Sequence, residues 1–184
     1  DANALLDKII AEKWLTAKAV VGFWPAQSNA EDIYLETKDN NPIILHFLRQ
    51  QAQKPGTRPN LCLSDFVASK SSGVKDHIGA FAVNCGEGVD ARAKAFELEL
   101  DDYSSILLKA LADRFAESCT EWLHRKVRTE LWPYANNETL DNEALIQEQY
   151  QGIRPAPGYP ACPDHSEKIS LFKLLDAENQ IGLK

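Results

Sequence analysis

Short apolar or alternating runs mark the first half of the chain, and their lengths are typical of β-strands. Such runs occupy residues 19–25, 32–36, 43–48 and 77–83. We expect the first strand to end at Pro25, because proline cannot donate a ladder hydrogen bond. Polar turn residues at 38–42 separate the second and third runs, which indicates a hairpin or meander. A further extended piece is expected over 61–68, after a loop over 50–60.

Apolar residues recur every three to four positions in the second half, which is the spacing of amphipathic helices. Four helices are expected there: from Val89, from about Tyr103 to Glu130, from Asp141 or Asn142 to Tyr150, and after Asp164. A shorter helix over 3–14 precedes the strands. For the last helix, Asp164 and Glu167 have the spacing of a capping box.

The helix that begins near Tyr103 is the longest predicted element, and Asp101 or Asp102 is well placed to cap it. With roughly 28 residues it would be about 40 Å long, so we expect it to cross the domain. Its predicted apolar stripe consists of Leu107, Leu111, Phe115, Cys119, Trp122 and Leu123.

Strands in the first half and helices in the second favour one α+β domain over residues 1–184, with a twisted antiparallel sheet and flanking helices. No Gly-x-Gly-x-x-Gly motif follows any predicted strand. The Rossmann fold of many methyltransferases is therefore not expected.

The formal net charge of −7 argues against nucleic acid or an anionic membrane as a partner. No apolar run approaches the roughly 20 residues that a membrane span requires, and no signal peptide opens the sequence. The four cysteines are widely spaced, so we expect free thiols in the cytoplasm and no metal site. The first residues do not include an initiating methionine, which suggests a piece of a longer polypeptide.

Residues 152–165 hold four prolines and two glycines, a composition that excludes a helix or a central strand. A loop of this kind is stiff, so little chain entropy is lost when a ligand binds. Arg154 offers a planar fork of donors for a carboxylate or phosphate, and Tyr159 offers a flat face for a heterocycle. The alternative is a proline-rich surface connection between two helices.

Asp113 and Glu117 are four residues apart on the long predicted helix, so their carboxylates share one face. Acid–base catalysis would also require a nucleophile or a positioned water, and nothing in the sequence supplies one. We therefore assign no catalytic residue. The alternative for this face is a solvated surface with Arg114 and Arg125 nearby.

Five segments together resemble one known family, in the expected order: 76–83, 101–103, 109–114, 150–153, and the run Arg-Pro-Ala-Pro-Gly-Tyr-Pro-Ala-Cys-Pro-Asp-His over 154–165. That family is the S-adenosylmethionine-binding activation domain of cobalamin-dependent methionine synthase. The resemblance implies part of a methyltransferase of methionine biosynthesis, which transfers a methyl group from methyltetrahydrofolate to homocysteine. Cobalamin would be bound mainly by another domain of the parent chain. The activation domain would hold S-adenosylmethionine for reductive remethylation, with an electron from flavodoxin or a flavin reductase.

The resemblance also implies roles for individual residues. Arg154 would bind the carboxylate of S-adenosylmethionine, and loop carbonyls or a nearby carboxylate would accept from its amino group. Tyr159, with Pro160 and Ala161, would form the wall beside the adenine. The full set of implied ligand contacts is Arg154, Pro155, Ala156, Gly158, Tyr159, Ala161 and Glu117. His165 and Asp113 would contribute to docking on other domains.

The family pattern includes further ligand contacts upstream of Asp1 and downstream of Lys184. We therefore expect that these 184 residues lack part of the family's site and of its sheet. A rival hypothesis from another class is a non-catalytic docking module, which would use the acidic helix face and the proline-rich loop to contact a protein.

Overall fold

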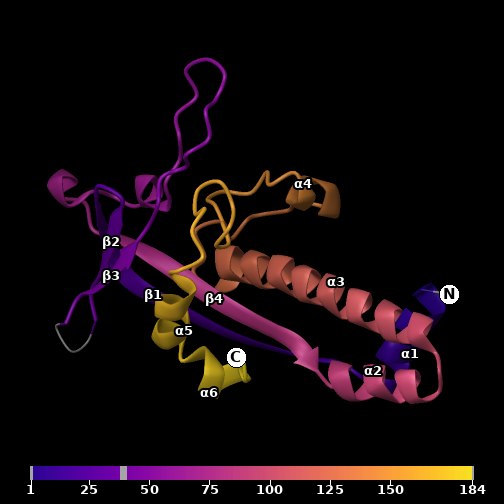
Figure 1. Ribbon diagram of the computed structural model, residues 1–184. Coiled ribbons are helices and arrows are strands. Elements are labelled where there is room, and N and C mark those ends of the chain that lie inside the picture. Colours follow the sequence, from indigo (N-terminus) through magenta and orange to yellow (C-terminus); the bar gives the residue numbers. More distant parts are fainter. Residues whose placement is uncertain (1, 38–40, 184) are drawn as a thin grey trace. The chain divides into compact units, whose positions relative to one another are not determined.

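The structure is a computed structural model that describes residues 2–37 and 41–183 (Figure 1). It has the expected α+β class, with an open antiparallel sheet, flanking helices and one long helix. The elements are α1 (Ala2–Glu12), β1 (Thr16–Asn29), β2 (Asp32–Leu35), β3 (Ile43–His46), η1 (Leu63–Phe66), η2 (Lys70–Ser72), β4 (Asp76–Glu87), α2 (Val89–Leu98), α3 (Asp102–Lys126), η3 (Val127–Leu131), α4 (Asn142–Ile146), α5 (Lys168–Leu175) and α6 (Ala177–Ile181).

The sheet has the strand order β3-β2-β1-β4. β1 pairs antiparallel with β2 from Ala26↔Leu35 to Asn29↔Asp32, and β2 pairs antiparallel with β3 over its whole length. This pairing confirms the predicted meander. Three residues of the predicted turn, 38–40, lie outside the described residues.

The prediction that the first strand ends at Pro25 is wrong, because β1 continues to Asn29. Pro25 lies one residue before the first β1–β2 pair, so the missing N–H falls at the end of that ladder. Its carbonyl still accepts a hydrogen bond of 2.9 Å from the Glu36 N–H. A proline therefore remains within the strand at the cost of one donor.

The chain divides into two compact units. The first comprises the residues up to Ala19 together with Val83–Ile153 and Ile181–Leu183, and the second comprises Val20–Ala82 and Arg154–Gln180. The buried core of the first unit consists of Ile9, Trp14, Val89, Ala93, Leu108 and Ala112. That of the second consists of Ala26, Ile33, Leu35, Leu45 and Val67, with Leu171 and Leu174 of α5 packed against it.

Helix α3 belongs to the first unit, where α1 and α2 pack against it (Figure 1). Asp101 caps the helix, because its carboxylate accepts a hydrogen bond of 3.0 Å from the Ser104 N–H. Asp101 was one of the two alternatives predicted for this cap. The predicted apolar stripe is right only in part: Leu123 is buried and Leu111 packs against the core, but the other buried positions of the helix are Ser105, Leu108, Ala112 and His124. Small residues on this face allow α2 to pack closely, while Phe115 and Trp122 remain 39% and 59% exposed.

Three other boundaries differ from the predictions. Residues 61–68 are not extended, because Leu63–Phe66 form the 3-10 turn η1. Helix α4 ends at Ile146 rather than Tyr150, and Glu148 adopts a left-handed φ of 54°. Helix α5 begins only at Lys168, because the Asp164 carboxylate accepts from the Ser166 N–H and hydroxyl and so closes a turn instead of a capping box.

Candidate functional site

The proline-rich loop folds into a closed turn within the second unit. The Gly158 N–H donates to the Cys162 carbonyl at 2.7 Å, and the Cys162 N–H donates to the Tyr159 carbonyl at 2.8 Å. The Tyr159 N–H donates to the Ala156 carbonyl at 3.1 Å. Prolines contribute no N–H, so the stretch has few donors, and those of Gly158, Tyr159 and Cys162 close the turn. The loop is therefore irregular, as predicted, and shaped by its own hydrogen bonds.

These bonds also bear on the predicted ligand acceptors. The carbonyls of Ala156, Tyr159 and Cys162 already accept hydrogen bonds within the loop. They are therefore poorer candidates for binding an ammonium group than the sequence suggested.

The predicted ligand residues of the loop differ in exposure. Tyr159 is 61% exposed, and Pro160, Ala156 and Gly158 are exposed as well. Arg154 and Pro155 are half-buried, and Arg154 makes at least one interaction within the protein. Ala161 is buried. The loop thus offers solvent a phenol ring beside a proline, which is a flat apolar surface.

His165 is exposed and lies against Gly158, whose φ of +104° is in the left-handed region. Close by in sequence, Glu167 forms the N-cap of α5 and is buried, at 7% exposure. Its Oε2 has no hydrogen-bond partner among the described residues. A buried acceptor without a partner is unusual, and the sequence indicated Glu167 only as part of a capping box with Asp164.

The two predicted acidic residues, Asp113 and Glu117, are on α3 in the first unit, so they are described apart from the loop. Both are exposed. Glu117 forms an ion pair of 2.9 Å with Arg114, one helical turn away. Exposed pairs of this kind contribute little to stability, so both carboxylates face solvent at small energetic cost.

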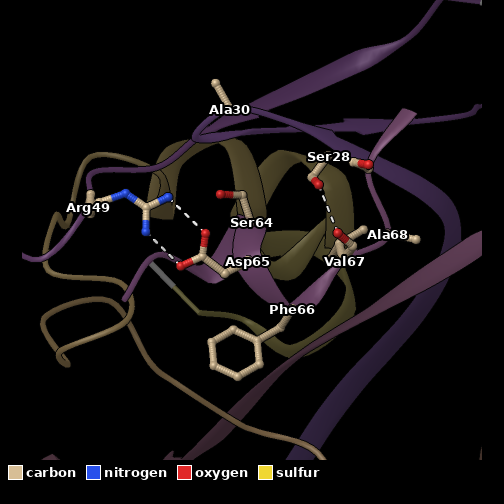
Figure 2. Close-up of a pocket in the computed structure, with 9 residues that line it drawn as sticks. Ser28, Ala30, Arg49, Ser64, Asp65, Phe66, Val67 and Ala68 are labelled. Atoms are coloured by element: carbon tan, nitrogen blue, oxygen red, sulfur yellow. Dashed lines mark hydrogen bonds and ion pairs between the residues drawn. The ribbon is translucent and has the colours of Figure 1, made fainter. Parts of the chain in front are cut away.

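A hollow of about 560 Å³ in the second unit is lined by Arg49, the segment 64–69, Ser28 and Ala30, and Figure 2 draws these residues as sticks. Arg49 forms a bidentate pair with Asp65 at 2.7 and 2.8 Å, and its Nε donates to Glu31 at 3.0 Å. These contacts raise the pKa of Arg49 and lower that of Asp65. The guanidinium is thus neutralised within the protein, and no residue of the proline-rich loop lines this hollow.

Sequence reasoning missed this ion pair because it treated residues 61–68 as extended. The signal present was Asp65 placed three residues after Cys62, whose N–H donates to the Asp65 carboxylate at 2.9 Å. The Arg49–Asp65 pair joins η1 to the chain around Arg49.

A family model described as the activation domain of vitamin B12-dependent methionine synthase matches residues 1–184. The chain belongs to this family. A solved structure described as the MetH reactivation domain bound to AdoHcy is 52% identical, with a TM-score of 0.91. The match covers 100% of this chain and 57% of that one, so this chain spans little more than half of its solved relative. The resemblance inferred from the proline-rich loop and four other segments is confirmed.

A buried ion pair anchors the end of α3 in this activation domain, and no pattern in the sequence indicated it. Arg128 is fully buried in the π-helical turn η3, and its Nε and Nη2 donate to the Glu138 carboxylate at 2.7 and 2.6 Å. Its Nη1 lies 2.7 Å from Nδ1 of His124. A guanidinium cannot accept, so this nitrogen of His124 carries no proton. The Arg128 guanidinium also stacks on Tyr150, 4.3 Å from the ring centroid.

The activation domain has four free cysteines, of which Cys62, Cys85 and Cys162 are buried and Cys119 is half-buried. Burial raises the pKa of Cys85 to about 11, with a further contribution from neighbouring Cys119. Within residues 2–37 and 41–183, no group of three or more potential ligands is arranged to hold a metal ion. In the same ranges, no helix has the length and apolar character needed to cross a bilayer.

Proposed function

We propose that this activation domain binds S-adenosylmethionine at the proline-rich loop and presents its methyl group to a cobalamin held by another domain of a methionine synthase. The observation that carries the proposal is the 52% identical relative, which was solved with AdoHcy bound. AdoHcy differs from S-adenosylmethionine by the transferred methyl group alone, so both share the carboxylate, the amino group and the adenine. The net charge of −7 also suits a cationic sulfonium.

Within the loop, Arg154 binds the ligand carboxylate through its fork of donors, and Tyr159 with Pro160 forms the adenine wall. The backbone of Pro155, Ala156, Gly158 and Ala161 shapes the surface between them. Glu117 is kept as a proposed ligand contact on the resemblance alone; its carboxylate is exposed and pairs with Arg114 within the first unit. The internal hydrogen bonds of the turn support this assignment, since a preformed loop loses little entropy on binding.

The domain contributes positioning and no catalytic side chain. Holding the methyl donor in place converts an encounter of two molecules into a local event. Cobalamin, held by another domain and reduced by flavodoxin or a flavin reductase, would supply the metal that accepts the methyl group. The whole reaction is part of methionine biosynthesis in the cytoplasm.

Asp113 and His165 are proposed to contact other domains, because both are exposed and neither contributes to a core. The rival docking function would use these same residues and the loop without any methyl donor. Exposed Tyr159 fits either function, so ligand binding has to decide between them.

The test is calorimetry with S-adenosylmethionine on the parent protein and on its Arg154→Ala variant. We expect affinity to fall by roughly 30-fold or more, because a charged partner of the carboxylate is removed. Arg58→Ala is the matched control, since Arg58 is an exposed arginine in another loop of the same unit. Its affinity should equal that of the parent.

Undiminished affinity in Arg154→Ala would remove the role assigned to the loop. If the parent protein shows neither calorimetric binding nor a thermal shift with S-adenosylmethionine, the docking function is favoured instead. Adenosine and methionine, tested separately, should each produce a smaller thermal shift than the intact ligand.

A further inference from the structure

Two of the free cysteines meet in the first unit, Cys85 on β4 and Cys119 on α3. Their thiols form a hydrogen bond, and because this bond raises the pKa of Cys85, the Cys85 S–H is the donor. The two residues are far apart in the sequence, so only the fold brings them together. A disulfide has an S–S bond of about 2.05 Å, and thiols already in hydrogen-bond contact need only a small approach to form it.

The backbone around Cys85 is held in place by its neighbour Asn84. The Asn84 side-chain oxygen accepts from the Gly86 N–H at 3.0 Å, and its nitrogen donates to the Ile181 carbonyl at 2.9 Å. Cys85 itself is 3% exposed. A dissolved oxidant therefore does not reach the Cys85 thiol directly, whereas the neighbouring Cys119 thiol does.

Cys119 is the accessible member of the pair. It is half-buried, and together with Lys18 and Trp122 it lines a second hollow, of about 570 Å³. The Lys18 ammonium lies 2.7 Å from a Glu87 carboxylate oxygen, so only part of its charge acts on the hollow. A nearby lysine favours the thiolate, which is the reactive form of cysteine. A small oxidant that enters the hollow thus meets Cys119 first.

We propose that Cys85 and Cys119 are a redox-active pair, which a hydroperoxide oxidises to an intramolecular disulfide and a dithiol reductant restores. With hydrogen peroxide, the Cys119 sulfur attacks one oxygen, the O–O bond breaks, and Cys119 becomes a sulfenic acid while the other oxygen leaves as water. The Cys85 sulfur then attacks the Cys119 sulfur, the S–O bond breaks, and the hydroxyl leaves as water with the proton from Cys85. Overall, the two thiols lose two electrons and one peroxide is reduced to two waters.

The order of these steps follows from the difference between the two thiols. With a pKa of about 11, Cys85 holds its proton near neutral pH and is a poor first nucleophile. A sulfenic acid without a thiol beside it is oxidised further and irreversibly, so Cys85 also protects Cys119. The disulfide joins β4 to α3, the helix that carries Glu117. In a reducing compartment such a bond is transient, as in proteins that sense oxidants.

The other two cysteines provide a matched control within the same molecule. Cys62 and Cys162 lie in the second unit and are near one another, because the charge of Cys62 contributes to the raised pKa of Cys162. They are 0% and 3% exposed, so neither is accessible in the way that Cys119 is. The Cys62 thiol donates to the Glu31 carbonyl at 3.9 Å. We therefore expect no peroxide-driven disulfide between them.

The experiment treats the native full-length parent protein with hydrogen peroxide, blocks the remaining thiols with N-ethylmaleimide and digests the protein without a reductant. Mass spectrometry should find the peptides of Cys85 and Cys119 joined within one molecule, with the loss of two hydrogens. Dithiothreitol should separate these peptides again. Cys62 and Cys162 should not be joined to each other.

Two variants test the order of the steps with dimedone, which labels sulfenic acids. In Cys85→Ser, Cys119 should be labelled roughly tenfold more than in the unsubstituted protein, because no thiol remains to convert its sulfenic acid into a disulfide. In Cys119→Ser, Cys85 should stay reduced and unlabelled, since it is buried and has lost the partner that delivers the oxidation.

The inference is overturned if Cys85 and Cys119 both stay free under peroxide, or if they join only between two copies at dimer mass. Joining of Cys62 to Cys162 to the same extent would show that proximity alone, and not the accessible Cys119, drives the reaction. Equal dimedone labelling in Cys85→Ser and the unsubstituted protein would also exclude the pair. None of these readouts involves S-adenosylmethionine, so this inference and the proposed function fail separately.

Discussion

Gly158 lies against the imidazole of His165 so closely that a β-carbon at residue 158 would stand 2.8 Å from Nε2. The φ of +104° at Gly158 is also one that residues with a side chain rarely adopt. Two independent constraints therefore require glycine at this bend. The shape of the proline-rich loop depends on both of them.

Gly158→Ala should destabilise the second unit by about 1–3 kcal/mol, because the alanine is strained and meets a ring. It should also weaken S-adenosylmethionine binding, since the loop must shift. Chemical denaturation and calorimetry measure the two effects. Gly56→Ala is the control for strain alone, because Gly56 has a φ of +72° and a β-carbon added there would meet no other atom within 4 Å.

The double variant Gly158→Ala, His165→Ala separates the two causes. Removing the ring should reduce the loss of stability to about the loss measured for Gly56→Ala. If the double variant is no more stable than Gly158→Ala, contact with His165 is not the reason for the glycine.

Glu138→Gln should destabilise the first unit by about 3–5 kcal/mol, because it leaves the fully buried Arg128 guanidinium without a countercharge. Glutamine keeps the size of the side chain, so the effect reports on charge. Glu130→Gln removes the exposed Lys126–Glu130 pair of 2.7 Å and should cost less than about 1 kcal/mol. Urea unfolding of both variants measures the contrast, and similar losses would contradict this account of the buried pair.

The same pair makes stability depend on pH. Hydrogen bonds from Arg128 lower the pKa of Glu138 below its ordinary value of 4.5. The contribution of Glu138 is therefore complete above about pH 4.5 and is lost as the pH falls through its lowered pKa. The difference in free energy of unfolding between the unsubstituted protein and Glu138→Gln should shrink below about pH 4.5. A difference that stays constant down to acid unfolding would exclude this linkage.

Residue spacing was sufficient to predict the α+β class, a hairpin or meander formed by the first three strands, and a cap at Asp101 or Asp102, because each depends on local chemistry. The buried face of α3 was not predictable in this way. Leu107 is more hydrophobic than Ser105 and Ala112, yet these two smaller residues are buried where α2 packs against α3. Tertiary packing therefore decided which residues of α3 are buried.

For the candidate site, the proline content predicted an irregular, stiff loop at 152–165, and resemblance supplied its family. The sequence did not reveal that carbonyls of the loop accept hydrogen bonds from the loop itself and close a turn. This depends on the φ of Gly158 and on the Gly158–Cys162 hydrogen bond. The Arg128–Glu138 pair was also invisible, because a ten-residue separation across a turn has no periodic signal.

Leu100→Gly should stabilise the first unit by about 1 kcal/mol. Leu100 follows the C-cap of α2 with a left-handed φ of 59°, and the Asp101 N–H donates to the Phe96 carbonyl at 2.9 Å, as in a Schellman motif. Glycine is favoured at this position, and Leu100 is 91% exposed, so no core contact is lost. Thermal unfolding measures the change. Leu98→Gly, within α2 and also exposed, should instead lower stability, and a loss in both variants would contradict the prediction.

Cys85 should make stability fall at alkaline pH. Burial, assisted by neighbouring Cys119, raises its pKa from 9.0 to about 11, so the folded protein holds the thiol proton more tightly than the unfolded chain. The stabilisation is complete below about pH 9 and is lost as the pH rises towards 11. Urea unfolding across this range should show a shallower decline in Cys85→Ala than in the parent. Cys119→Ala should show most of the decline in stability seen in the unsubstituted protein, since burial is the larger cause of the raised pKa of Cys85. Parallel curves for the parent and Cys85→Ala would show that Cys85 does not carry this dependence.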